Sequence, residues 1–142
     1  MKAISPILSH TILLAVGLAA ITLILISVSN FSADMEKISI TSQLSYAAEF
    51  VKGEILRIYS LANQSKTTNK VKLSLPERIG NEPYTIELYQ NGLKVGTSLR
   101  NEVLEINKKV NISAILNGTS TLPASLMQQK LENGDILISL VD

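Results

Sequence analysis

A long run without charge near the N-terminus limits what this chain can fold into. No Asp, Glu, Lys or Arg occurs in residues 4–33, and residues 7–28 are almost wholly apolar. An α-helix rises about 1.5 Å per residue, so these twenty-odd residues reach roughly 33 Å, enough to cross a hydrocarbon core about 30 Å thick. The run therefore predicts a helix that spans a membrane.

A cleaved secretory signal is the alternative interpretation of this run. Lys2 gives it a basic start and Ser27-Val28-Ser29 a tolerable cleavage site, but the apolar stretch is longer than the roughly 7 to 15 residues typical of such signals. The charges that flank the run predict its orientation. Lys2 precedes it, while Asp34 and Glu36 follow it, so we expect the N-terminus in the cytoplasm and the C-terminal part outside.

The helix is expected to begin near Ser5-Pro6, because serine can cap a helix and proline is tolerated in its first turn. It is expected to continue through residues 34–62, where the pattern becomes amphipathic. Apolar residues recur there in steps of three and four, at Leu44, Ala48, Val51, Ile55, Ile58 and Ala62. We expect the chain's own β-rich domain to cover this stripe, since helical stripes usually cover a core, and a neighbouring subunit's helix is the alternative.

Beyond a polar connector at residues 63–69, the apolar pattern changes to a period of two, which indicates strands. The expected strands are residues 71–75, 84–88, 93–99, 103–107, 110–116 and 136–141. Asn91-Gly92, Asn117-Gly118 and Asn133-Gly134 are expected to form turns, and residues 126–131 one or two turns of helix. The predicted fold class is α+β: a long helix, hydrophobic in its first half and amphipathic in its second, packed on a small antiparallel β-sheet.

Composition argues against most kinds of chemistry. The 13 Lys+Arg residues nearly balance the 12 Asp+Glu residues, so no basic surface for nucleic acid is expected. The chain has no cysteine and no phosphate-binding or metal-binding motif. Its single histidine, His10, lies in the apolar run, where we expect a polar patch near the membrane interface or a contact between subunits. We expect no enzyme activity, no cofactor and no metal site.

Four Asn-x-Ser/Thr sequons provide candidate N-glycosylation sites, at Asn30, Asn63, Asn111 and Asn117. All four lie at or after the end of the apolar run. Their positions agree with an exterior C-terminal part.

The N-terminal residues Lys2-Ala3-Ile4-Ser5-Pro6-Ile7-Leu8, followed at once by the apolar helix, resemble the class III signal of archaeal type IV pilin-like proteins. The sequence Leu-Pro-Glu-Arg-Ile-Gly at residues 75–80, running into Tyr-Thr-Ile-Glu-Leu at residues 84–88, is similar to a segment of their extracellular β-domains. The resemblance implies cleavage by a prepilin peptidase after Ala3, with Lys2, Ala3 and Ile4 as the processing residues. The parts would then be a leader at residues 1–3, a filament-core helix at 4–33, its amphipathic extension at 34–62 and a β-rich domain at 63–142.

The resemblance also implies partners: lipid before assembly, the assembly machinery, and copies of the chain or related pilins afterwards. Assembly would use the apolar helix surface, for which the candidate residues are Ile7, Leu13, Leu14, Val16, Gly17, Leu18, Ile21, Leu23, Ile24 and Leu25. The leading hypothesis is a major or minor subunit of an extracellular filament with a role such as cell adhesion. The second is a permanently anchored exterior β-domain with a binding or stator-like role, and an anchored enzyme is a distant third.

Overall fold

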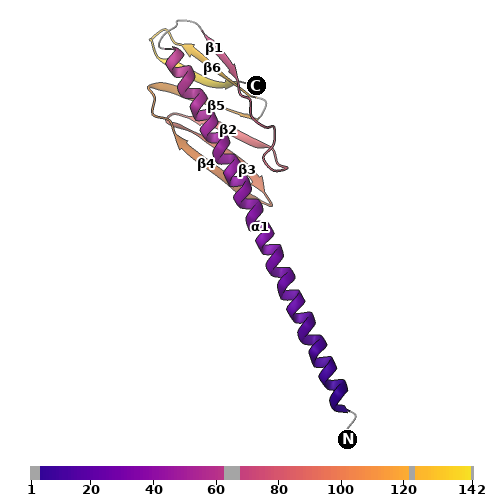
Figure 1. Cartoon of the computed structure of the whole chain (residues 1–142). Helices are drawn as coiled ribbons and strands as arrows, with labels where there is room; N and C mark the ends of the chain where they lie inside the picture. The colour runs from indigo at the N-terminus through magenta and orange to yellow at the C-terminus, as the bar shows by residue number, and fades with distance from the viewer. Residues whose placement is uncertain (1–3, 63–67, 122–123, 142) are drawn as a thin grey trace. The chain divides into compact units, whose positions relative to one another are not determined.

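The structure is a computed structural model that describes the backbone of residues 4–62, 68–121 and 124–141, and their side chains from residue 8 onward. It contains one α-helix, α1 (Ile4–Ala62), followed by seven β-strands (Figure 1). The chain divides into two compact units, Met1–Ile38 and Ser39–Asp142, and α1 belongs to both.

Local sequence explains why α1 is so long. Pro6 lies in its first turn, where the ring removes no needed hydrogen bond, and the next proline in the chain is Pro76. The helix ends at Ala62, where the polar connector begins. The predicted single helix, with its start near Ser5-Pro6, is therefore confirmed.

The strands of the second unit form one sheet in the order β1-β6-β7-β5-β2-β3-β4. All neighbouring strands are antiparallel except β5 and β7, which are parallel. Strands β1 and β4 are the two edges. The strand bounds are β1 (Asn69–Lys72), β2 (Tyr84–Tyr89), β3 (Gly92–Leu99), β4 (Glu102–Lys109), β5 (Ala114–Thr121), β6 (Ser125–Lys130) and β7 (Ile136–Val141).

The C-terminal part of α1 packs on one face of this sheet (Figure 1). All six residues of the predicted stripe, from Leu44 to Ala62, are at most 2% exposed. They share a core with alternate residues of the strands, such as Ile86 on β2 and Val95 on β3, which pair across the sheet. Burying each large aliphatic side chain contributes roughly 1.5 to 3 kcal/mol. The predicted α+β fold is confirmed, and the chain's own sheet covers the stripe.

Three expectations for the sheet were wrong. Residues 126–131 are not helical: they lie in and just after β6, where Leu126 and Gln128 alternate with more exposed residues and face the core. Asn117-Gly118 is not a turn but the middle of β5. Among the described residues the sheet has seven strands, where six were expected. Strand bounds also differ, since β4 extends to Lys109 and β5 begins only at Ala114, where residues 110–116 were expected to form one strand.

Two other turns lie at or next to their expected positions. The hairpin expected at Asn91-Gly92 is present, but its turn lies one residue earlier, at Gln90 and Asn91, and Gly92 opens β3 directly opposite Tyr89. Asn133-Gly134 lies in the turn between β6 and β7. The β3–β4 hairpin was not marked by a glycine, and its two loop residues, Arg100 and Asn101, both have positive φ, as a type I′ turn requires.

Candidate membrane and assembly surface

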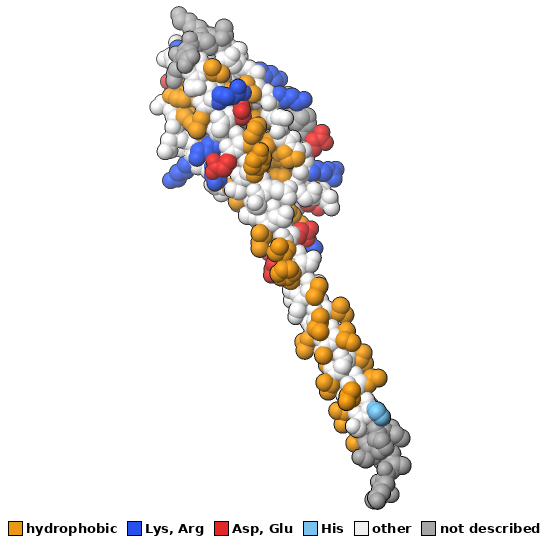
Figure 2. All heavy atoms as spheres, viewed as in Figure 1, with side chains coloured by type: hydrophobic (Ala, Val, Ile, Leu, Met, Phe, Trp, Pro, Cys, Tyr) orange, Lys and Arg blue, Asp and Glu red, His pale blue; other side chains and the backbone are white. Residues whose placement is uncertain are grey.

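The first unit exposes an apolar surface on every side of α1. Each large apolar side chain from Leu8 to Ile38 is more than half exposed. The consecutive residues 23–26 show why no face is spared, because successive positions on a helix differ by about 100° and all four are exposed and aliphatic. Figure 2 shows hydrophobic side chains along this part of the helix, while charged side chains gather on the second unit. A helix apolar all round needs an apolar environment.

The predicted assembly residues whose side chains are described are all exposed on α1. Leu13, the most exposed of them, has 73% of its surface accessible. The other exposed members are Leu14, Val16, Gly17, Leu18, Ile21, Leu23, Ile24 and Leu25. The side chain of Ile7 lies outside the described part. Gly17 has open space around it, since a Cβ added there would meet no atom within 4 Å.

Hydroxyl groups in this unit bond to the helix itself. Thr22 Oγ1 donates to the carbonyl oxygen of Leu18 at 2.9 Å, and Ser27 Oγ donates to that of Leu23 at 2.8 Å. A polar group in hydrocarbon is costly unless it is hydrogen-bonded. These two residues therefore enter an apolar environment with their donors already satisfied.

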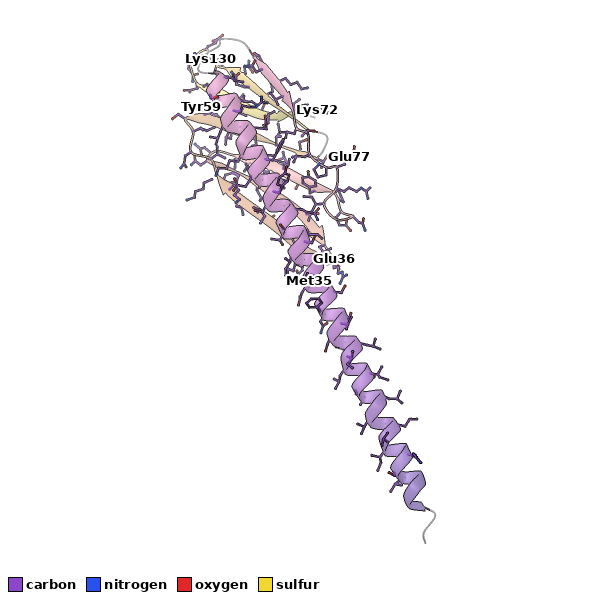
Figure 3. The ribbon with its side chains drawn as sticks, viewed as in Figure 1. Met35, Glu36, Tyr59, Lys72, Glu77 and Lys130 are labelled. Atoms are coloured by element: carbon purple, nitrogen blue, oxygen red, sulfur yellow. The ribbon has the colours of Figure 1, made fainter. Side chains whose placement is uncertain are left out.

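The exposed apolar surface continues past the first charged residues of α1. This continuation was not predicted from the sequence. Asp34, Glu36 and Lys37 are exposed on α1, yet Phe31, Met35 and Ile38 between and around them are 66%, 51% and 62% exposed. Steps of four and three residues place these three apolar side chains on one face of the helix. We call them the collar stripe. The helical spacing of these three residues is visible in the sequence, but the charged residues among them obscured the pattern. Figure 3 labels Met35 and Glu36 at this point of α1.

The remaining predicted positions are dispersed. Lys2 and Ala3 lie outside the described residues, as does Asn63, and only the backbone of Ile4 is described, at the start of α1. His10 is exposed on the apolar helix. Asn30 is exposed on α1, whereas Asn111 and Asn117 are exposed on the second unit.

The outer face of the sheet, opposite α1, carries an ion cluster. Lys94 Nζ on β3 lies 3.0 Å from Glu87 Oε2 on β2 and 3.6 Å from Glu105 Oε1 on β4. The hydrogen bond with Glu87, together with the charges of both carboxylates, raises the pKa of Lys94. All three side chains are at least one-third exposed, so this cluster stabilises the sheet only modestly.

Buried polar groups on the second unit are mostly satisfied inside the fold. The Tyr84 hydroxyl donates to the carbonyl oxygen of Pro76 at 2.8 Å, and burial raises the pKa of Tyr84 to about 12. Thr97 Oγ1 donates to the carbonyl oxygen of Pro83 at 2.8 Å. Gln128 is fully buried, and its Nε2 has no hydrogen-bond partner among the described residues. The Tyr84 and Thr97 bonds tie the segments at Pro76 and Pro83 to strands β2 and β3.

No cluster of three or more His, Asp or Glu side chains that could hold a metal ion occurs in the described ranges. One helix among the described residues, α1, is long and apolar enough to cross a membrane, and its most apolar stretch has no buried residue. The feature of the described residues that stands out most is therefore the exposed apolar surface of α1.

The family model DUF7266, described as a family of unknown function, matches residues 1–124. No curated protein and no solved structure matches the chain.

Proposed function

We propose a function for this chain, which belongs to the family DUF7266. The chain acts as a structural subunit of an archaeal type IV pilus-like surface filament and joins its neighbours through the first unit of α1. The observation that carries this proposal is the collar stripe, because it extends the exposed apolar surface beyond the length that a bilayer requires.

The length of the exposed apolar surface distinguishes a filament subunit from a simple membrane anchor. About twenty helical residues cross the hydrocarbon core of a bilayer, so a span that begins near Leu8 ends near Val28. Lipid can cover that part. Met35 and Ile38 lie seven and ten residues further along α1, beside charged residues that favour water. Exposed apolar area costs about 25 cal/mol per Å² in water, so a protein neighbour is the cover that suits these side chains.

The two halves of α1 would have different roles, because the second half is already covered by the chain's own sheet. The apolar stripe of the second half is buried on that sheet from Ile40 onward. The exposed apolar side chains of α1 are therefore concentrated on the first unit, which is the surface we assign to neighbouring copies. A helix that is apolar all round can leave lipid for the core of a filament without exposing apolar area to water.

Orientation and processing complete the proposal. Lys2 lies before the apolar run, and the positive-inside rule places it in the cytoplasm, with the second unit outside. The resemblance at residues 2–8 supports cleavage after Ala3 by a prepilin peptidase before assembly.

Two substitutions in the native cells test this proposal. Ala3→Asp should block processing and leave a membrane-bound precursor. Ile24→Ser should permit insertion and processing yet give fewer or weaker filaments, because serine weakens apolar packing without the roughly 2.5 to 3.5 kcal/mol insertion penalty of a charge. The N-terminal sequence of the purified protein and electron microscopy of surface filaments provide the measurements.

A permanently anchored exterior domain gives a different result. It would tolerate Ala3→Asp with no change in size or location. Normal filaments that contain an uncleaved Ala3→Asp protein would refute the processing step. Filaments that lack this protein would refute the structural role.

A further inference from the structure

The sequon at Asn111 lies in a surface loop that backbone hydrogen bonds hold in place. Asn111-Ile112-Ser113 connects the end of β4 with the start of β5. The backbone N–H of Val110 donates to the carbonyl oxygen of Asn91 at 3.0 Å, which ties this loop to the β2–β3 hairpin. The N–H of Ile112 donates to the carbonyl oxygen of Val110 at 3.2 Å. This i to i+2 bond is that of a γ-turn, and Asn111 occupies its apex.

Burial alternates along the loop in a way that presents the sequon to solvent. Val110 is buried, and the half-buried Ile112 packs against the core. Asn111 and Ser113, on either side of Ile112, are exposed. Within the described ranges neither of these two side chains has a hydrogen-bond partner. The carboxamide and the hydroxyl of the sequon are therefore accessible together.

The sequon at Asn117 is held differently, although the Asn117 side chain is exposed. Its three residues lie within β5, where Asn117 pairs with Ser139, and Gly118 and Thr119 pair with β2. Gly118 has a φ of +124°, and a Cβ placed on it would lie 2.9 Å from the backbone nitrogen of Leu140. β7 holds this segment on one side and β2 on the other, so an enzyme cannot draw it into its own site without opening the sheet.

Asn30 lies inside α1, on the surface that the proposed function gives to lipid and neighbouring subunits. A hydrophilic glycan at that position conflicts with an apolar environment. Asn63 lies outside the described residues. Among the described sequons, the one at Asn111 alone combines a loop, solvent exposure and an exterior position.

We propose that Asn111 carries an N-linked glycan. This inference rests on the proposed function, because glycosylation of a sequon requires that the second unit be exported. The donor is a lipid-phosphate-linked glycan, and the catalyst is a membrane glycosyltransferase. Asn111 Nδ2 attacks the anomeric carbon of the first sugar and forms the N–C bond. The C–O bond to the lipid phosphate breaks, the phosphate leaves with the electron pair, and Nδ2 loses one proton.

A groove beside the loop offers space for the first sugar. Its volume is about 570 Å³, and it is lined by Tyr59, Asn91 and residues 109–113. Tyr59, labelled in Figure 3 near the end of α1, is half-buried and supplies an apolar ring. Asn91 and Lys109 supply polar side chains. A sugar ring has both apolar and hydroxyl faces, so this mixed lining suits it.

Intact-mass measurement of the full-length protein from native membranes tests the inference. The wild type should exceed the mass of its polypeptide, counted from the N-terminus found by sequencing, by one glycan. Asn111→Gln and Ser113→Ala should each lose that whole mass, while Ser113→Thr should keep it, because threonine preserves the sequon. Asn117→Gln is the matched control and should keep the glycan. This control assigns the glycan to one sequon. A tryptic digest cannot do so by peptide mass, because both sequons lie on one peptide, residues 110–130.

Two outcomes would overturn the inference. One is a glycan that persists in Asn111→Gln or disappears in Asn117→Gln. The other is a wild-type protein without any glycan. Protease added to intact cells then distinguishes the levels of failure: if it cleaves the second unit, the glycan proposal fails alone, and if the second unit is protected, the proposed topology fails with it.

Discussion

Glu49 of α1 and Lys108 of the edge strand β4 form an ion pair, with 2.7 Å between Glu49 Oε1 and Lys108 Nζ. The pair links the helix to the free edge of the sheet. The Lys108 side chain lies on the same face of β4 as Ile106, which is partly buried against the core, and is 28% exposed. The hydrogen bond and charge of Lys108 lower the pKa of Glu49. A lysine on an edge strand also discourages pairing with another sheet.

We expect the ion pair to stabilise the folded protein at neutral pH and to lose this effect in acid. A carboxyl group whose pKa is lowered in the folded protein stabilises it above the group's ordinary pKa, and this contribution is lost as the pH falls through the lowered pKa. In a soluble fragment that begins at Asp34, Glu49→Gln should lower the melting temperature at neutral pH and have a vanishing effect in acid. Glu77→Gln, which removes an exposed carboxylate, controls for net charge. An effect of Glu49→Gln that is equal at both pH values would contradict the assignment.

Two adjacent residues of α1 provide a sharp test of helix packing. Ile55 is fully buried against the sheet, whereas its neighbour Leu56 is 41% exposed. Ile55→Ala should lower the free energy of unfolding of the same fragment by about 2 to 5 kcal/mol, since it removes a core side chain and leaves a cavity. Leu56→Ala should change it by about 0.5 kcal/mol or less. Denaturant unfolding of both variants makes the comparison, and similar losses would mean that the stripe does not face the sheet.

The helix could be predicted from the sequence because its signals are local and repeated. The stripe from Leu44 to Ala62 keeps its three- and four-residue steps throughout, and no proline interrupts it. Strand β6 was missed because its residues favour helices by propensity and because a polar residue, Gln128, occupies a buried position. The parallel pairing of β5 with β7 joins strands that are not adjacent in the sequence, and no local pattern encodes it.

Two glycines should respond in opposite ways to alanine. Gly118 has φ of +124° and lies against the backbone of Leu140, so Gly118→Ala should destabilise the fragment by at least about 1 kcal/mol. Gly53 lies within α1 with no atom within 4 Å of an added Cβ, so Gly53→Ala should stabilise it by up to about 1 kcal/mol. Thermal unfolding measures both. A tolerated alanine at position 118 would mean that β7 does not approach β5 as closely as described.

The candidate surface was predictable only in part. The absence of charge in residues 4–33 indicated an apolar helix, and the exposure of its side chains in the first unit agrees with that. The collar stripe was not identified, because Asp34, Glu36 and Lys37 dominate the composition of that segment. Helical geometry separates the two sets of side chains onto different faces, and a composition window averages them.

The collar stripe predicts a defect that affects assembly alone. Met35→Gln and Ile38→Gln keep side chains that favour helices but replace exposed apolar surface with amides. Membrane insertion should be unchanged, because both positions lie beyond the roughly twenty residues that cross the bilayer. The second unit should fold as before, since its core begins at Ile40.

If a neighbouring subunit covers the stripe, the double variant, which carries both Met35→Gln and Ile38→Gln, should yield several-fold fewer filaments by electron microscopy. Val103→Gln alters an apolar residue on β4 that is 69% exposed and serves as the matched control. Equal filament yields from the double variant and the control would assign the stripe to the membrane surface and remove the main support for assembly.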